Sequence, residues 1–88
     1  MNPTQATKII LRPYITEKTF ALVEKESRIC FIVDSDASKP MIKEAIKTLY
    51  EEDALDINTA KTIVGKKAFV KFESIEKARD LATKIGML

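Results

Sequence analysis

Apolar residues recur along the chain at the spacings of strands and of amphipathic helices. Residues 29–33 (ICFIV) are all apolar, so both faces of this predicted strand need a cover. Residues 38–53 (SKPMIKEAIKTLYEED) are apolar at positions 42, 45, 46 and 49, which is the pattern of an amphipathic helix. Residues 74–86 predict another helix between Ser74, the expected N-cap, and Gly86, the expected stop signal.

The N-terminal third of the chain predicts a short strand followed by a helix. Pro13 restricts the preceding residue to extended conformations, so a strand around Lys8–Leu11 ends there. Thr16 is a favourable N-cap for a helix that runs to about residue 26. Phe20 and Val23 share the apolar side of this helix.

The C-terminal half predicts a β-hairpin and completes the fold class. Two strand-like segments, residues 55–64 and 66–73, flank Gly65. The predicted order of elements is therefore β-α-β-α-β-β-α. This order indicates an α+β fold in one domain, residues 1–88, with a four-stranded, mainly antiparallel sheet. Helices on both sides of the sheet would make a three-layer α/β/α arrangement.

The segment GKKAFVKF, residues 65–72, nearly matches the octamer of RNA-recognition modules. Lys66 and Lys67 stand where that pattern has a glycine and its first aromatic residue. One alternative is therefore a free-standing module that stacks single-stranded RNA on Phe31 and Phe69. Too few residues follow the last helix for the final strand of that fold. We expect instead that the helix at residues 16–26 covers the row containing Phe31, with both phenylalanines in the core.

Composition removes most catalytic chemistry. The chain has no histidine, one cysteine and two glycines, which leaves no usual metal-ligand set and no glycine-rich phosphate loop. Cys30 is expected to be a small buried apolar residue. We therefore predict no enzyme activity, no catalytic residue, no metal and no cofactor. No apolar run has membrane-spanning length, so no membrane insertion is expected.

The net charge of +2 is distributed unevenly. Residues 35–55 carry a net charge of −2, whereas residues 56–72 carry +3. The lysines of the second stretch either bind phosphates or keep a sheet edge soluble. Asn58 and Thr59 either form a bulge or offer polar groups to sugar and phosphate oxygens. The acidic residues 51–53 are either a solvated helix end or the contact patch of a protein-only interaction domain.

Four segments together resemble one known family. PYITEK, DASKPMIKEAI, INT and GKKAFVKFES, in this order and spacing, are similar to the universal large-subunit ribosomal protein twenty-three. The resemblance implies that the chain is a structural component of the cytoplasmic ribosome. It also implies a fold in which helices pack on an antiparallel sheet. It also implies binding to the third domain of large-subunit rRNA beside the exit of the nascent-chain tunnel. There the chain would neighbour ribosomal protein twenty-nine and offer a landing surface for factors that receive new chains.

The resemblance also assigns roles to single residues. Nine positions match RNA-facing residues of the family, and Lys61 of the basic stretch is added to them. The ten predicted RNA-binding residues are Arg12, Thr16, Lys18, Lys39, Lys43, Asn58, Thr59, Lys61, Lys66 and Lys67. Glu17 matches the carboxylate with which bacterial members dock the trigger factor chaperone. Bacterial members carry a long hairpin loop, whereas KTIVGKK alone joins the strands here, as in the short archaeal form. This departure argues against a tunnel-lining role and against trigger factor. It favours signal recognition particle and the Sec translocon as partners.

Overall fold

The computed structural model describes residues 1–86 and contains one antiparallel sheet flanked by helices. The elements in chain order are α1 (Pro3–Ile9), β1 (Ile10–Pro13), α2 (Glu17–Glu26), β2 (Arg28–Val33), α3 (Lys39–Tyr50), β3 (Asp56–Thr62), β4 (Gly65–Lys71) and α4 (Ile75–Lys84). The strands lie in the order β1-β2-β4-β3, and each neighbouring pair is antiparallel. The predicted α+β class with a four-stranded antiparallel sheet is confirmed.

Side-chain caps explain where the helices start. The hydroxyl of Thr16 accepts from the backbone N–H of Thr19 at 3.2 Å, while the hydroxyl of Thr19 accepts from the N–H of Thr16 at 2.7 Å. Ser38 and Ser74 cap α3 and α4 by accepting from the backbone three residues later. The predicted N-caps Thr16 and Ser74 are confirmed, and each satisfies a backbone donor that the helix leaves free.

A helix that the hydrophobic pattern did not predict precedes the first strand. Asn2 accepts from the backbone N–H of Gln5 at 2.8 Å, and the Gln5 side chain accepts from the N–H of Asn2 at 3.3 Å. Pro3 occupies the first turn, where a missing N–H costs nothing. The strand predicted at residues 8–11 therefore starts too early, because residues 8 and 9 complete α1.

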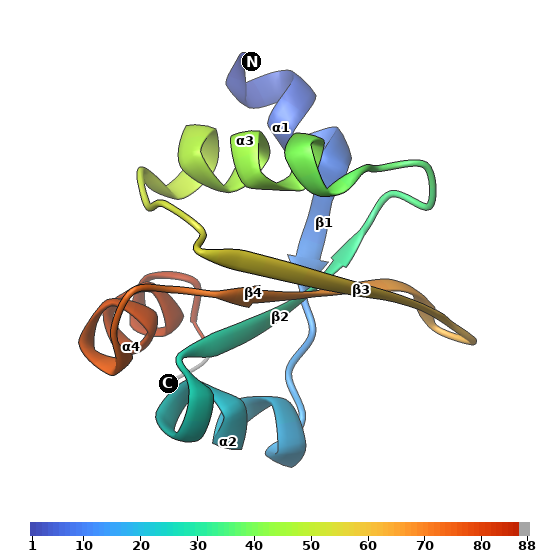
Figure 1. Ribbon diagram of the computed structural model, residues 1–88. Helices are drawn as coiled ribbons and strands as arrows, with labels where there is room; N and C mark the ends of the chain where they lie inside the picture. Colours follow the sequence, from blue (N-terminus) through green and yellow to red (C-terminus); the bar gives the residue numbers. More distant parts are fainter. Residues whose placement is uncertain (87–88) are drawn as a thin grey trace.

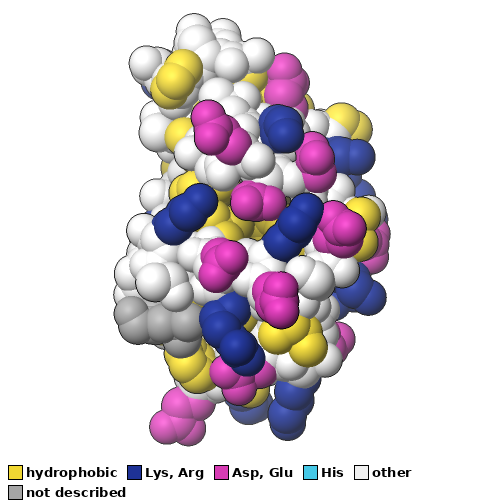
Figure 2. Space-filling model, turned by 90° about the vertical axis from the view of Figure 1, so that its left-hand side faces the viewer, with side chains coloured by type: hydrophobic (Ala, Val, Ile, Leu, Met, Phe, Trp, Pro, Cys, Tyr) yellow, Lys and Arg dark blue, Asp and Glu magenta, His cyan; other side chains and the backbone are white. Residues whose placement is uncertain are grey.

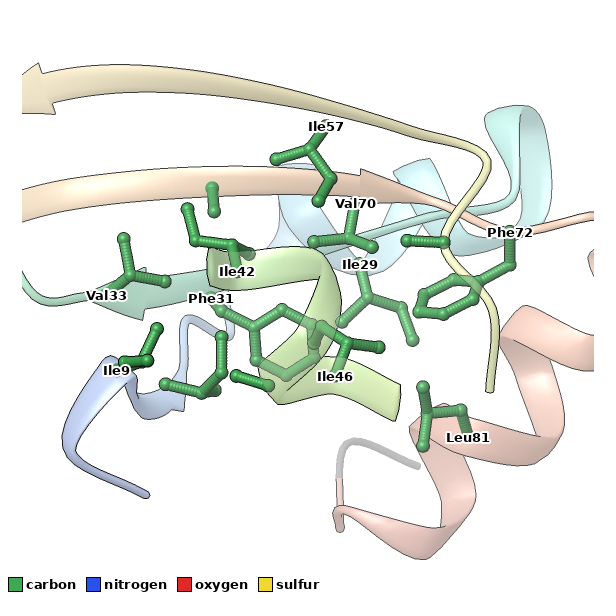
Figure 3. Packing of buried hydrophobic residues seen from close by; sticks show 14 of the residues in the cluster. Ile9, Ile29, Phe31, Val33, Ile42, Ile46, Ile57, Val70, Phe72 and Leu81 are labelled. Atoms are coloured by element: carbon green, nitrogen blue, oxygen red, sulfur yellow. The ribbon is translucent and has the colours of Figure 1, made fainter. Parts of the chain in front are cut away.

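The main core lies between the sheet and α3. Ile29, Phe31 and Val33 of β2 point to one face, which we call the α3 face. Figure 3 shows Ile46 of α3 against this row, and the ring of Tyr50 stacks on Phe31 with centroids 5.9 Å apart. In Figure 1, α1 and α3 lie on this side of the sheet and α2 lies on the other side. The expectation that residues 16–26 cover Phe31 is wrong, because the longer apolar stripe of α3 occupies that face.

The opposite face, which we call the α2 face, carries Cys30, Ile32 and Phe69. Cys30 is directly opposite Phe69 in the ladder between β2 and β4. Phe31 is fully buried on the other face, whereas Phe69 is only half-buried. Phe31 is therefore confirmed as a core residue, and Phe69 is not. Because the two rings point to opposite faces, they cannot form one stacking platform, and the RNA-recognition alternative is wrong.

Two apolar residues near helix starts are substantially exposed, and one of them, Phe20, was predicted to lie on the apolar side of its helix. Phe20 is 36% exposed although Val23, on the same helix, is buried, and Ile75 is 40% exposed at the start of α4. Helical side chains lean toward the N-terminus, so apolar residues near a helix start project past the body of the helix.

Within residues 1–86, no helix has the length and apolar character that crossing a bilayer requires.

The different burial of the two phenylalanines predicts different stabilities for their alanine variants. Phe31→Ala removes a fully buried ring and should lower the free energy of unfolding by about 3–5 kcal/mol. Phe69→Ala removes a half-buried ring and should cost about 1 kcal/mol. Urea denaturation followed by circular dichroism measures both. If Phe31→Ala does not fold, Phe31→Leu replaces it, and equal losses at positions 31 and 69 would contradict the assigned faces.

Candidate RNA interface

The ten predicted RNA-facing residues separate into two groups on opposite sides of the sheet. Adjacent residues of a strand point to opposite faces, so neighbours in sequence such as Asn58 and Thr59 are separated. The group on the α2 face consists of Arg12, Thr16, Lys18, Asn58 and Lys67. The group on the α3 side consists of Lys39, Lys43, Thr59, Lys61 and Lys66. No single flat surface brings all ten together.

On the α2 face, a groove of about 700 Å³ opens between the start of α2 and strand β4. It is lined by Tyr14, Thr16, Glu17, Lys18, Thr19, Leu22, Lys67 and Phe69. The ladder places Arg12 opposite Ile32 and Ile32 opposite Lys67, so Arg12 and Lys67 point to the same side. Asn58 is opposite Phe69 and extends this polar surface toward the edge strand β3.

A cation–π contact holds one lysine of this groove in place. The Lys67 amine lies 4.3 Å from the centre of the Tyr14 ring. Tyr14 is absent from the predicted set, although its place two residues after Arg12 and two before Thr16 is a signal that could have found it. The ring attracts the ammonium group and favours this orientation of the lysine side chain.

On the α3 side, the hairpin lysines lie near the start of α3. Lys61 and Lys66 are directly opposite each other on β3 and β4. The Lys66 amine donates a hydrogen bond of 2.6 Å to the backbone carbonyl of Ala37, just before α3 begins. Lys39 and Lys43 line a second groove of about 300 Å³ between α3 and the start of β3. Because Lys66 and Lys67 point to opposite faces, one phosphate group cannot be bound by both.

Ion pairs distinguish the predicted basic residues from the others. Within residues 1–86, none of the seven predicted lysine and arginine side chains pairs with a carboxylate. The basic side chains that do pair are Arg28 with Glu26 and Asp56, Lys47 with Asp53, Lys77 with Glu73, and Arg79 with Glu24. Figure 2, which views the molecule from the α4 side, shows both signs of charge intermixed there. The hairpin turn lies at the opposite end of the molecule in Figure 1.

The single cysteine is structural. Cys30 is fully buried, as predicted, and burial raises the pKa of its thiol to about 11, with the nearby charge of Lys67 acting in the other direction. Across residues 1–86, no group of three or more histidine, cysteine, aspartate or glutamate side chains is arranged to hold a metal ion.

Comparison with known proteins identifies the family. A family model described as Ribosomal protein L23 matches residues 8–84, which is most of the 88-residue chain. The chain belongs to the ribosomal protein L23 family. Membership makes it a structural, non-enzymatic component of the large subunit of the cytoplasmic ribosome and part of a ribonucleoprotein. The resemblance seen in the sequence is confirmed, and so is the prediction that the chain is not an enzyme.

Relatives from archaea support this membership along nearly the whole chain. The protein of Methanobrevibacter smithii named Large ribosomal subunit protein uL23 is 45% identical over 80 residues, which cover 90% of this chain and 93% of that protein. The proteins of the same name from Methanococcus vannielii and Methanococcus maripaludis are each 39% identical over 83 residues, covering 93% of this chain and 96% of theirs. These L23 relatives have little additional length, in agreement with the short archaeal form of the hairpin.

The buried thiol predicts a specific pH dependence of stability. The pKa of Cys30 is about 11 in the folded chain, against an ordinary value of 9.0. The protonated thiol therefore stabilises the fold fully below pH 9, and this contribution is lost as the pH rises from 9 to 11. Over this range the natural chain should lose about 2–3 kcal/mol more stability than Cys30→Ala. Guanidinium denaturation at pH 8 and at pH 11 tests this, and parallel losses in the two proteins would contradict it.

Proposed function

We propose that this L23-family chain binds the third domain of large-subunit rRNA beside the nascent-chain exit through two basic surfaces, one on each side of its β3–β4 hairpin. The observation that carries the proposal is that, in the part of the chain that the structure describes, all seven predicted basic residues lack carboxylate partners. Four of the other eight basic residues are paired. An amine without a carboxylate nearby can neutralise a phosphate without first breaking an internal ion pair.

The division of the residues between two faces supports a particular mode of RNA binding. Lys61 and Lys66 face the α3 side, whereas Arg12 and Lys67 face the α2 side. A surface binder would concentrate its positive charge on one face. A hairpin with positive charge on both faces suits a position between two RNA segments, with phosphates on either side. Helical RNA is recognised largely through its shape, phosphates and 2′-hydroxyls, which lysines and small polar side chains such as Asn58 can contact.

The length of the hairpin bears on the position of the chain relative to the tunnel. A turn of only two residues, Ile63 and Val64, joins β3 and β4. Such a hairpin cannot extend far beyond the body of the domain. We infer that the chain lies at the tunnel exit next to ribosomal protein twenty-nine and does not line the tunnel.

Glu17 is the centre of the proposed docking surface for targeting factors. It is exposed in the first turn of α2, and within residues 1–86 it forms no ion pair. The neighbouring groove adds apolar surface from Leu22 and Phe69. A free carboxylate beside these two apolar side chains suits a partner that offers a basic and apolar contact. We propose signal recognition particle and the Sec translocon as partners that dock here.

Removing single positive charges tests the RNA-binding proposal. The variants Lys61→Gln and Lys67→Gln each lose one charge, on the α3 and α2 faces respectively, and Lys84→Gln removes a charge outside the predicted set. The affinity for protein-free large-subunit rRNA is measured as a function of salt concentration. Each hairpin variant should bind more weakly and reduce the slope of log affinity against log salt by about 1, whereas Lys84→Gln should not. Equal slopes for all three variants would contradict the proposal.

Docking at Glu17 can be separated from binding to RNA. Glu17→Gln keeps the size of the side chain and removes only its charge. Subunits that contain this variant should form normally, because the residue is not needed for phosphate binding. Their affinity for signal recognition particle should fall about tenfold, as expected for the loss of one charge-assisted contact. Unchanged binding of both signal recognition particle and the Sec translocon would exclude docking at this position.

A further inference from the structure

The turn of the hairpin carries the most exposed apolar side chain among the described residues. Ile63 is 104% exposed and Val64 is 43% exposed. Both are β-branched, and they are the two central residues between β3 and β4. In Figure 1 this turn projects from the sheet, away from every helix. The side chains therefore do not contribute to the core.

Local backbone chemistry does not explain these residues. Two-residue hairpin turns favour Asn, Asp and Gly, and turns in general favour small polar residues. Here the left-handed conformation falls on Gly65, with φ +123°, so the positions of Ile63 and Val64 would accept a polar residue without strain. The turn is also already fixed, because the hydroxyl of Thr62 donates to the carbonyl of Gly65 at 2.7 Å. Two apolar residues at a site that favours polar ones indicate a contact outside the domain.

The charge around the turn indicates the chemistry of that contact. Residues 57–72 contain four lysines and no aspartate or glutamate. Lys61 and Lys66 flank the turn from opposite strands, and Asp56, at the far end of β3, lies beside Arg28. Whatever covers the turn must accept apolar side chains in the middle of positive charge. RNA provides both an apolar contact and negative charge, because an unstacked base has an apolar face and its flanking phosphates are negative.

We propose that Ile63 and Val64 form an apolar plug that packs against the face of an unstacked base in large-subunit rRNA, while Lys61 binds a phosphate beside it. The inference rests on the proposed function and adds the class of RNA feature that the hairpin recognises. Apolar side chains are known to occupy the space between unstacked bases in nucleic acid complexes. The short two-residue turn, closed by the hydrogen bond from Thr62 to Gly65, limits the ordering of the backbone that binding requires.

The energetic test compares two serine substitutions. Ile63→Ser removes the plug, and Ile75→Ser makes the same chemical change at an exposed isoleucine outside the hairpin. For protein-free large-subunit rRNA, Ile63→Ser should weaken binding about tenfold without changing the salt slope, because no charge is lost. Ile75→Ser should leave affinity unchanged. Thermal unfolding of both variants checks that the fold is retained, and an effect of Ile63→Ser below twofold, or equal to that of Ile75→Ser, would overturn the proposal.

A crosslinking test identifies the partner directly. A diazirine analogue of leucine at position 63 is incorporated into the full chain, assembled into large subunits and irradiated. A crosslink to an rRNA nucleotide whose base lies outside a helical stack is the expected result. A crosslink to a ribosomal protein, to a paired base, or to nothing would overturn the plug. The salt slopes of Lys61→Gln and Lys67→Gln report separately on the proposed function, so the plug can fail while RNA binding by the lysines holds.

Discussion

The pairing of β4 with β2 on one side and β3 on the other is the constraint on which the rest of the structure depends. This central ladder places Ala68 and Val70 in the core and sends their neighbours to the opposite face. It thereby separates Lys66 from Lys67 and Asn58 from Thr59. A shift of one residue would bury lysines under α3 and expose the apolar row. The positions of the predicted RNA-facing groups are therefore fixed by the same register that forms the core.

A second feature of this small domain is that its ion-paired basic residues and its hairpin lysines lie at different ends. Around α4 and the end of α3, lysines and arginines lie beside carboxylates, as the pairs Lys77–Glu73 and Lys47–Asp53 show. On the hairpin, Lys66 contacts a carbonyl and Lys67 an aromatic ring, and within residues 1–86 neither pairs with a carboxylate. These contacts orient the amines without neutralising them. The hairpin end thus keeps its charge for an external partner, while the α4 end is electrostatically balanced and suits exposure to solvent.

The sequence predicts local structure well and spatial partners less well. Capping residues such as Thr16 and Ser74 could be recognised because a cap depends on only a few neighbouring residues. The same signal was present at Asn2 and Gln5 but lay outside the hydrophobic pattern, so α1 was missed. Alternation showed that the row containing Phe31 is buried, yet it could not show which helix covers it. That choice depends on chain geometry between distant segments.

The candidate site shows the same limit. The ten residues came from a family resemblance and a run of positive charge, both of which are linear features of the sequence. The division into two faces follows from strand alternation once the register is known, but the bond from Lys66 to the carbonyl of Ala37 joins residues 29 positions apart. Likewise, the contact between Lys67 and Tyr14 depends on how the segment before α2 crosses the sheet. Such contacts need the assembled fold.

The positive charge of the hairpin lysines also affects the stability of the chain when RNA is not bound. Lys61 and Lys66 are directly opposite each other, and like charges in this position destabilise a strand pair. In the proposed function, phosphates between or beside these two lysines remove that repulsion, so RNA binding would stabilise the hairpin as well as the complex. A partner present at a hundred times its dissociation constant adds about 2.7 kcal/mol to the stability of the folded state. For a domain of 88 residues, whose core is small, this is a large share of the total. In the proposed function, the residues that weaken the isolated hairpin are therefore those through which rRNA stabilises it.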